Sequence, residues 1–478
     1  MSINKEVHIE QDKVVLRKEL GFVSAASFVV GSIIGSGIFI SPKGVLQNTG
    51  SVGLCLVVWA VAGLISLGSA LCYAEMGAMI GISGGQYTYI RLGLGNFLGF
   101  IFAAQRTLVR NSMSQIIMLL TFAKYTVSIL PTCGSPLLLE KLIAALTLVG
   151  IVLINMYSSR LAARLTVVTT AGKTSALIVI CVGGIVSIIK GVNSELGSGF
   201  SGTRSDPSSI ALAFYSALWA YGGASSLTCL VEEIKSPGKN VPRSIMTGCL
   251  FTLAIYVMTN VSYLAVMTRS ELLQSNAVAA LFADKVLQNI SILIPVAVMV
   301  SAFGSTNNIV LSTSRITFTA ARDGNLPDFL SYIQISQLTP FGAMTITVSL
   351  SLLYLLPADL GQFISLAGFL DAFFDACTFV ALIRFRLQTM KDAHRPVKIP
   401  LLIPILMLLV NIYLFVAPII FKPRLEYVYV AASVFTGATL LYIPFVRFGL
   451  KVPFYDKIVT CLQLIFEVCP PAKSEHKP

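Results

Sequence analysis

The chain has little charge and very little histidine. Only 12% of its 478 residues are charged and three are histidines, whereas 55% are hydrophobic. The mean hydropathy is +0.81. A soluble protein needs more charged side chains than this to cover its surface. The composition therefore excludes a soluble globular protein and indicates a polytopic membrane protein.

The scarcity of histidine also weighs against catalysis. Residues Gly81–Gly84 fit the Gly-x-Ser-Gly pattern of intramembrane serine proteases. Such a serine needs a general base within reach, but His8, His394 and His476 fall in predicted tails or loops. The sequence also has no clustered metal ligands and no phosphate-binding loop. We expect no enzyme, cofactor or metal, with an intramembrane enzyme as a remote alternative.

Twelve apolar runs are each long enough to cross a bilayer, which takes about 20 residues. They lie at 20–44, 52–80, 96–129, 138–157, 164–189, 208–232, 243–268, 289–319, 341–357, 360–383, 400–420 and 426–447. Residues 1–18 are too polar for a signal peptide, so the first run is expected to remain as a span. The connections are short, and the sequence predicts an all-α integral membrane protein.

Lysine and arginine predict the orientation of these spans. With the N-terminus inside, the inner tails and loops hold most of the 34 lysines and arginines. This positive-inside bias places both termini in the cytoplasm. It also accounts for the net charge of +12 without a nucleic-acid partner.

Small residues interrupt two of the apolar runs. GSIIGSG occupies Gly31–Gly37 in the first run, and AYGGASS occupies Ala220–Ser226 in the sixth. The two places are equivalent if spans one to five and six to ten are two repeats, the second inverted. Broken helices at matching places of inverted repeats point to the substrate site of a transporter. A packing face of small residues would fit Gly31 and Gly35, but it leaves the second interruption unexplained.

This repeat pattern divides the chain into five parts. They are an N-terminal tail (1–19), a first five-helix repeat (20–190), an inverted repeat (207–384), two further helices (400–447) and a C-terminal tail (448–478).

An unwound stretch inside a membrane exposes backbone groups that need partners. The N-terminus of a half-helix offers N–H donors and a positive dipole to a carboxylate. The C-terminus of the preceding half offers carbonyl oxygens to an ammonium group. An α-amino acid carries both charges side by side, so the interruptions predict an amino acid site.

Four long motifs make the chain recognisable. They are VGSIIGSGIFISP, CYAEMGAMIGISGGQYTYI, AYGGASSLTCLVEEIKSPGKNVPRSI and SRITFTAARDGNLPDFLSYIQISQLTPFGAM. The chain resembles the light subunits of heteromeric amino acid transporters, in the amino acid–polyamine–organocation superfamily, over about residues 17–450. Within this family it resembles most the kidney branch that carries aspartate and glutamate.

The resemblance implies a LeuT-like fold of twelve transmembrane helices, with a 5+5 inverted repeat and helices one and six broken. It also implies sodium-independent exchange of aspartate, glutamate and cystine by alternating access in the plasma membrane, for this branch the apical membrane of kidney epithelium. A neutral or cationic amino acid exchanger and a proton-coupled symporter are the alternatives.

One cysteine has a special place. Cys133 is the only cysteine predicted in an outer loop, so it either bonds another polypeptide or is a free thiol. The resemblance implies that this cysteine forms a disulfide with a single-span glycoprotein heavy subunit, of the rBAT type for this branch.

The resemblance also implies roles for five residues at the interruptions. Ser36 and Gly37 match the donors to the substrate carboxylate. Ile33, Trp219 and Gly222 match the carbonyl groups that receive the ammonium group, and Trp219 matches the aromatic residue that closes over the substrate.

The chain departs from its relatives immediately after the two glycines of the second interruption. Relatives that prefer large neutral side chains often have Trp-Asn there, whereas this chain has Ala224 and Ser225. This difference puts a leucine-type substrate in doubt.

Cations within the spans are candidate functional groups because a charge at membrane depth is costly. Lys173 matches a lysine that takes the place of sodium in sodium-independent members, and a snorkelling lysine is the alternative. Arg315 matches a general family arginine with a structural or gating role. Glu75, near a cytoplasmic end, is expected to anchor a gate or loop.

A second group of charges is expected to bind the substrate. Arg106 and Arg110 lie one turn apart, as do Asp371 and Asp375. An aspartate in the site would repel an acidic substrate unless an arginine pairs with it. We therefore expect Asp371 or Asp375 to pair with one of the arginines and leave net positive charge for the substrate.

Overall fold

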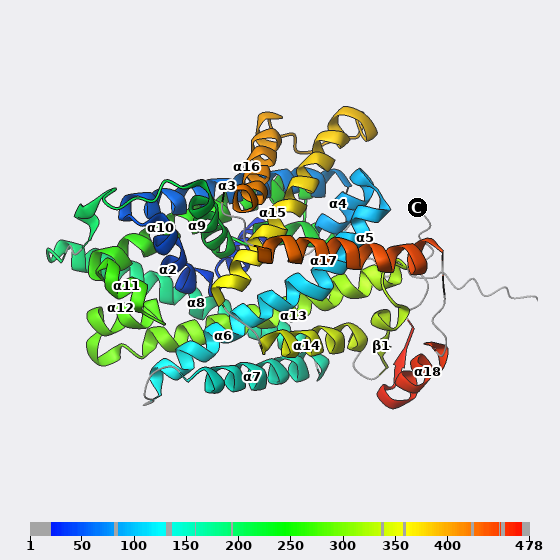
Figure 1. Cartoon of the computed structure of the whole chain (residues 1–478), viewed down its shortest axis with the longest axis horizontal. Helices are drawn as coiled ribbons and strands as arrows, with labels where there is room; N and C mark the ends of the chain where they lie inside the picture. Colours follow the sequence, from blue (N-terminus) through cyan, green and yellow to red (C-terminus); the bar gives the residue numbers. More distant parts are fainter. Residues whose placement is uncertain are drawn as a thin grey trace, which may run out of the picture.

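Long helices that run side by side make up most of the protein (Figure 1). The computed structural model describes residues 21–80, 85–130, 136–157, 159–192, 195–335, 339–356, 360–421, 425–448, 450 and 455–470. The helical membrane architecture expected from the sequence is confirmed.

Both predicted interruptions break helices. The first lies between α1 (Phe22–Ile33) and α2 (Gly37–Thr49), whose axes differ by 49°. Ile34 has extended backbone angles there, which end α1. The second follows α9 (Pro207–Ala220), where Gly223 has φ of 103° before the 3-10 helix η3 (Ala224–Glu233). Glycine tolerates this positive φ without strain.

Eight further helices are long and apolar enough to span a membrane, and the bent pair α1–α2 makes up to nine in the described part of the chain. They are α3 (Val52–Ile80), α7 (Leu137–Tyr157), α8 (Ser159–Ile189), α10 (Pro237–Val266), α13 (Leu293–Arg322), α15 (Leu360–Arg384), α16 (Leu402–Ile420) and α17 (Leu425–Leu441).

The other predicted spans coincide with shorter helices. A π-helical turn, η1 (Arg106–Arg110), joins α5 (Asn96–Gln105) to α6 (Asn111–Ile129). The helix α14 (Phe341–Leu355) has 15 residues. The total of twelve spans therefore stays a prediction.

Short elements cap the two ends of the bundle. They are α4 (Gly85–Leu94), α11 (Arg269–Gln274), α12 (Val278–Val286), α18 (Tyr455–Phe466), β1 (Ile333–Gln334), β2 (Val468–Cys469), and the turns η2 (Leu196–Ser198), η4 (Gln288–Ile290), η5 (Asp328–Ser331), η6 (Phe385–Thr389) and η7 (Tyr442–Arg447). Figure 1 places α11 and α12 at one end and α18 with β1 at the other.

The C-terminal segment folds back onto the bundle. Strand β2 pairs antiparallel with β1, which places Cys469 opposite Ile333. The ring of Phe466 lies 4.7 Å from that of Phe341, at the start of α14. This end of the chain therefore contacts the connection between α13 and α14.

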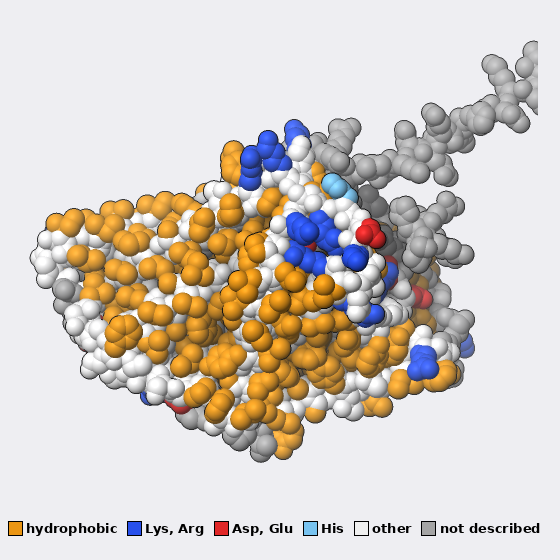
Figure 2. Space-filling view, turned by 90° about the horizontal axis from the view of Figure 1, so that it is seen from above, with side chains coloured by type: hydrophobic (Ala, Val, Ile, Leu, Met, Phe, Trp, Pro, Cys, Tyr) orange, Lys and Arg blue, Asp and Glu red, His pale blue; other side chains and the backbone are white. Residues whose placement is uncertain are grey.

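The outer surface is mainly apolar. Figure 2 shows hydrophobic side chains over most of the visible face, with lysine and arginine gathered towards the end where α18 lies. Leu138 and Leu146 of α7 and Leu402 of α16 are each 73% exposed. Such exposure of leucine suits a lipid environment. In the interior, α2 packs on α9, α1 on α10, and α6 on α13.

Candidate functional site

The two helix breaks contact each other. A Cβ atom added to Gly37 would lie 2.6 Å from Cα of Ala220, and one added to Gly223 would lie 2.4 Å from the carbonyl oxygen of Ser32. Neither position has room for a side chain. The glycines therefore let the two broken helices approach each other, in addition to unwinding them.

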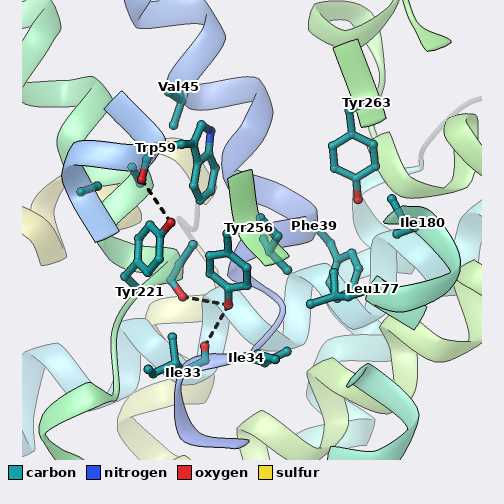
Figure 3. Close-up of a cluster of buried hydrophobic side chains, with 14 of the residues drawn as sticks. Ile33, Ile34, Phe39, Val45, Trp59, Leu177, Ile180, Tyr221, Tyr256 and Tyr263 are labelled. Carbon is teal, nitrogen blue, oxygen red and sulfur yellow. Dashed lines mark hydrogen bonds between the residues drawn. The ribbon is translucent and has the colours of Figure 1, made fainter. Parts of the chain in front are cut away.

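Tyr256 of α10 joins the ends of the two helices. Its hydroxyl lies 3.1 Å from the carbonyl oxygen of Ile33 and 3.1 Å from that of Ala220, the last residues of α1 and α9 (Figure 3). Both carbonyls are at helix C-termini, where no further turn can supply a donor. The single hydroxyl hydrogen can be donated to only one of them at a time. Tyr256 is not among the residues predicted from the sequence, because no local pattern distinguishes it.

Aromatic rings hold Tyr256 in place. Its ring centroid lies 4.9 Å from that of Tyr221 and 6.0 Å from that of Trp59. The Tyr221 hydroxyl donates to the carbonyl oxygen of Trp59 at 3.1 Å (Figure 3). All three side chains are buried, so the position of the Tyr256 hydroxyl is well determined.

The N-terminus of α2 lies directly after the first break. Helix α2 begins at Gly37, and its first N–H groups have no acceptor within the helix. Ser36 is buried, and its Oγ lies 2.6 Å from Sδ of Met118 in α6. Met118 is not among the residues predicted from the sequence either. Only three residues separate the acceptors at the end of α1 from the donors at the start of α2, which suits a ligand with carboxylate and ammonium groups on one carbon.

The other two expected ligands lie at the second break. Trp219 is partly buried near the end of α9, and its carbonyl oxygen accepts from the N–H of Gly222 at 3.2 Å. Gly222 is exposed in the turn that follows. The N–H of Tyr221 also reaches the carbonyl oxygen of Trp219. A carbonyl oxygen has two lone pairs, so Ile33, which accepts from Tyr256, can accept one more hydrogen bond.

Lys173 reaches the first broken helix from α8. Its Nζ donates to the carbonyl oxygen of Gly31 at 2.6 Å, and the residue is only 2% exposed. This geometry contradicts the snorkelling alternative. Because Gly31 is near the end of α1, the buried ammonium group ties α8 to the segment that leads into the break.

Arg110 forms an ion pair with Asp371 near the second break. Its Nε lies 2.9 and 2.8 Å from the two carboxylate oxygens of Asp371, and its Nη2 lies 2.7 Å from one of them. Its guanidinium carbon also lies 4.9 Å from the centroid of the Trp219 ring. Such a position favours a cation–π attraction. The structure thus selects Asp371 as the partner of Arg110.

Arg106 has a looser contact with the same aspartate. Its Nη1 lies 3.6 Å from the Asp371 carboxylate, beyond hydrogen-bond distance. The two arginines begin and end the π-helical turn η1. Turns of this kind occur frequently at functional sites. No feature of the sequence predicted this turn.

Asp375 binds other groups. It accepts from the Tyr73 hydroxyl at 2.7 Å and from Nε2 of Gln86 at 2.9 Å. The formal charges of Arg106, Arg110, Asp371 and Asp375 therefore sum to zero. The structure confirms that Asp371 pairs with an arginine, and net positive charge for the substrate stays a prediction.

Glu75 belongs to a separate network. It is fully buried in α3 and accepts from Nε of Arg386 at 2.8 Å and from the N–H of Ile399 at 3.1 Å. Arg395 lies 3.5 Å away. These contacts tie α3 to the segment between α15 and α16. Arg315 lies in α13, but its side chain is outside the described part of the structure, as is Cys133.

Helix α2 packs closely against its neighbours. A Cβ added to Gly44 would lie 2.8 Å from Oγ of Ser216 in α9. The Tyr125 hydroxyl of α6 donates to the carbonyl oxygen of Phe39 at 3.2 Å and accepts from the N–H of Ala279 at 3.2 Å. Helix α2 is thus connected to α9, α6 and α12.

Comparison with known families decides the class of protein. The amino acid permease family matches residues 20–444. The chain belongs to the amino acid permease family. This permease is a membrane transporter of amino acids and not an enzyme.

Two kinds of relatives match this permease along most of its length. It is 37% identical over 461 residues to the b(0,+)-type amino acid transporter 1 of Mus musculus, covering 96% of this chain and 94% of the relative. It is 40% identical over 407 residues to the large neutral amino acids transporter small subunit 2 of Homo sapiens, covering 84% and 76%. These relatives support the resemblance to light subunits, but they do not indicate the aspartate and glutamate branch.

Proposed function

We propose that this permease is a sodium-independent amino acid exchanger that works by alternating access. The observation that carries the proposal is the contact between Lys173 and the carbonyl oxygen of Gly31 at 2.6 Å. A bound sodium ion would use the same kind of backbone oxygen near a broken helix. A buried ammonium group fixed there removes the need for the ion.

The substrate backbone would bind between the helix ends. The N–H groups of Ser36 and Gly37 at the start of α2 would donate to the carboxylate. The carbonyl groups of Ile33, Trp219 and Gly222 would accept from the ammonium group. Trp219 would close over the bound molecule. Tyr256 would keep the two broken helices in register during this exchange.

The preferred substrates are proposed to have neutral side chains. The support is the pairing of Arg110 with Asp371, in which Nε and Nη2 donate to the carboxylate and neutralise the arginine nearest to Trp219. The names of the relatives point the same way, since one is a large neutral amino acids transporter. The small Ala224 and Ser225 favour substrates that differ from leucine in shape.

Acidic amino acids and cystine form the second candidate class. The observation that favours them is Arg106, which lies 3.6 Å from Asp371 and is 31% exposed in its side chain. Its guanidinium therefore has donors available for a substrate carboxylate. The two candidate classes differ in which arginine contacts the substrate side chain. Contact with Arg106 would favour acidic side chains, whereas contact with Arg110, which Asp371 neutralises, would favour neutral ones.

The permease is further proposed to be the light subunit of a heterodimer in the plasma membrane, with both termini cytoplasmic. The heavy subunit would be a single-span glycoprotein of the rBAT type, bonded through Cys133. A relative named as a small subunit supports this assembly. The test is gel electrophoresis without and with a reductant. A heterodimer band that is lost on reduction and absent in the variant Cys133→Ser would support the disulfide, and an unchanged band in this variant would contradict it.

Exchange in liposomes tests the proposed function. The purified protein would take up labelled neutral, acidic or cationic amino acids in sodium-free buffer, with and without unlabelled amino acid inside. Stimulation of neutral amino acid uptake by the internal load would support the proposal. A requirement for sodium would contradict it, and stimulation by acidic amino acids alone would favour the second class.

A further inference from the structure

We infer that Asp371 selects the charge of the substrate side chain, because it neutralises Arg110 at the wall of the amino acid site. This inference rests on the proposed exchange function. It makes Asp371 a specificity-determining residue that admits neutral side chains and excludes acidic ones.

The position of Arg110 connects it to the site. Its guanidinium lies over the ring of Trp219, 4.9 Å from the centroid. Trp219 immediately precedes Ala220, the last residue of α9, whose carbonyl oxygen accepts from Tyr256. The guanidinium is therefore beside the second helix break, where a substrate side chain would extend.

Asp371 is the more accessible member of the pair. The Arg110 side chain is 12% exposed, whereas that of Asp371 is 34% exposed. A substrate carboxylate that reaches this pair therefore contacts the Asp371 carboxylate more readily than the guanidinium. Two like charges in close contact repel each other, and the repulsion is strong where water is scarce.

Most of the donors of Arg110 are also engaged. Its Nε and Nη2 donate to Asp371, and its Nη1 donates to Ser114, which uses three of its five N–H groups. A substrate carboxylate would have to displace Asp371 to form a two-pronged pair through Nε and Nη2. Removal of the Asp371 charge would leave the same guanidinium free to accept an acidic side chain.

Asp375 provides a matched comparison. It lies one turn from Asp371 on α15, but it accepts from Tyr73 and Gln86 and not from Arg110. If any negative charge on α15 excluded acidic substrates, removal of the charge of either aspartate would admit them. If neutralisation of Arg110 excludes them, only removal of the Asp371 charge would admit them.

The test compares Asp371→Asn with Asp375→Asn in reconstituted liposomes. The readout is the ratio of kcat/KM for glutamate to that for a neutral amino acid. We expect Asp371→Asn to raise this ratio about tenfold or more, equivalent to about 1.4 kcal/mol, and Asp375→Asn to leave it unchanged. Asp371→Glu should restore the ratio, and Asp371→Asn combined with Arg110→Gln should abolish the gain.

The outcomes separate the two proposals. Neutral exchange by the natural protein without a gain of glutamate transport in Asp371→Asn would overturn the inference alone. Failure of the natural protein to exchange any amino acid would overturn the proposed function. Glutamate preference in the natural protein would overturn the inference, because Asp371 would then exclude nothing.

A second measurement covers a variant that folds but transports slowly. Thermal stabilisation of the purified protein by a bound substrate does not require turnover. Glutamate should stabilise Asp371→Asn and not the natural protein. Equal stabilisation of both proteins would overturn the inference.

Discussion

The hydroxyl of Tyr256 lies 3.1 Å from the carbonyl oxygen of Ile33, at the residue where α1 ends. The same hydroxyl reaches Ala220, where α9 ends. One side chain from an unbroken helix thus supports both interruptions. The carbonyl groups at these two helix ends have no donor within their own helices. Because they share the Tyr256 hydroxyl, the breaks can remain within a membrane.

Removal of this hydroxyl should weaken the site without disturbing the aromatic packing. In Tyr256→Phe the ring remains, but two buried carbonyl groups lose their donor, which costs about 1–3 kcal/mol. We expect a lower unfolding temperature in detergent and slower exchange. Tyr263→Phe is the control, because that buried hydroxyl of the same helix has no hydrogen-bond partner among the described residues. Equal effects of both variants would contradict the role of Tyr256.

A single methyl group at the first break should block the close approach of α2 and α9. Gly37→Ala places its Cβ 2.6 Å from Cα of Ala220, which the backbone can relieve only by moving. We expect loss of most exchange activity. Gly150→Ala in α7 is the control, since nothing described lies within 4 Å of its added Cβ. It should be neutral or stabilise the helix by up to about 1 kcal/mol. Full activity of Gly37→Ala in liposomes would refute the prediction.

Loss of the buried ammonium group should impair exchange in sodium-free buffer. Lys173→Met keeps much of the side-chain volume but removes the hydrogen bond to the carbonyl oxygen of Gly31. We expect exchange to fall about tenfold or more, the effect of about 1.4 kcal/mol. The control is Lys190→Met, which changes an exposed lysine directly after α8. Unchanged exchange by Lys173→Met would remove the main support for the sodium-independent mechanism.

Neutralisation of Glu75 should destabilise the fold more than it changes specificity. Glu75→Gln leaves Arg386 and Arg395 without their buried counter-charge. Breaking such a pair by removal of one partner costs about 3–5 kcal/mol. Thermal unfolding of the purified protein measures this loss. The double variant Glu75→Gln with Arg386→Gln should recover part of it, and a double variant less stable than either single one would contradict the pairing.

Local features of the sequence predicted much of this architecture. Apolar runs predicted the spans, and clusters of glycine and serine predicted both breaks, because helix length and helix disruption depend on neighbouring residues. Lys173 was identified for a similar reason, since a charge inside an apolar run is visible without a structure. The acidic substrate class had no such support, because the sequence does not show which of the two aspartates pairs with which arginine.

The tertiary structure alone decided which groups meet. Tyr256 and Ile33 are 223 positions apart, and only the packing of α10 against α1 brings the hydroxyl to that carbonyl group. The rotation of α15 about its axis likewise places Asp371 beside Arg110 and Asp375 beside Tyr73. The sequence by itself determined where the helices run and where they break. The partners of its buried polar groups depend on contacts between distant helices, which no local pattern encodes.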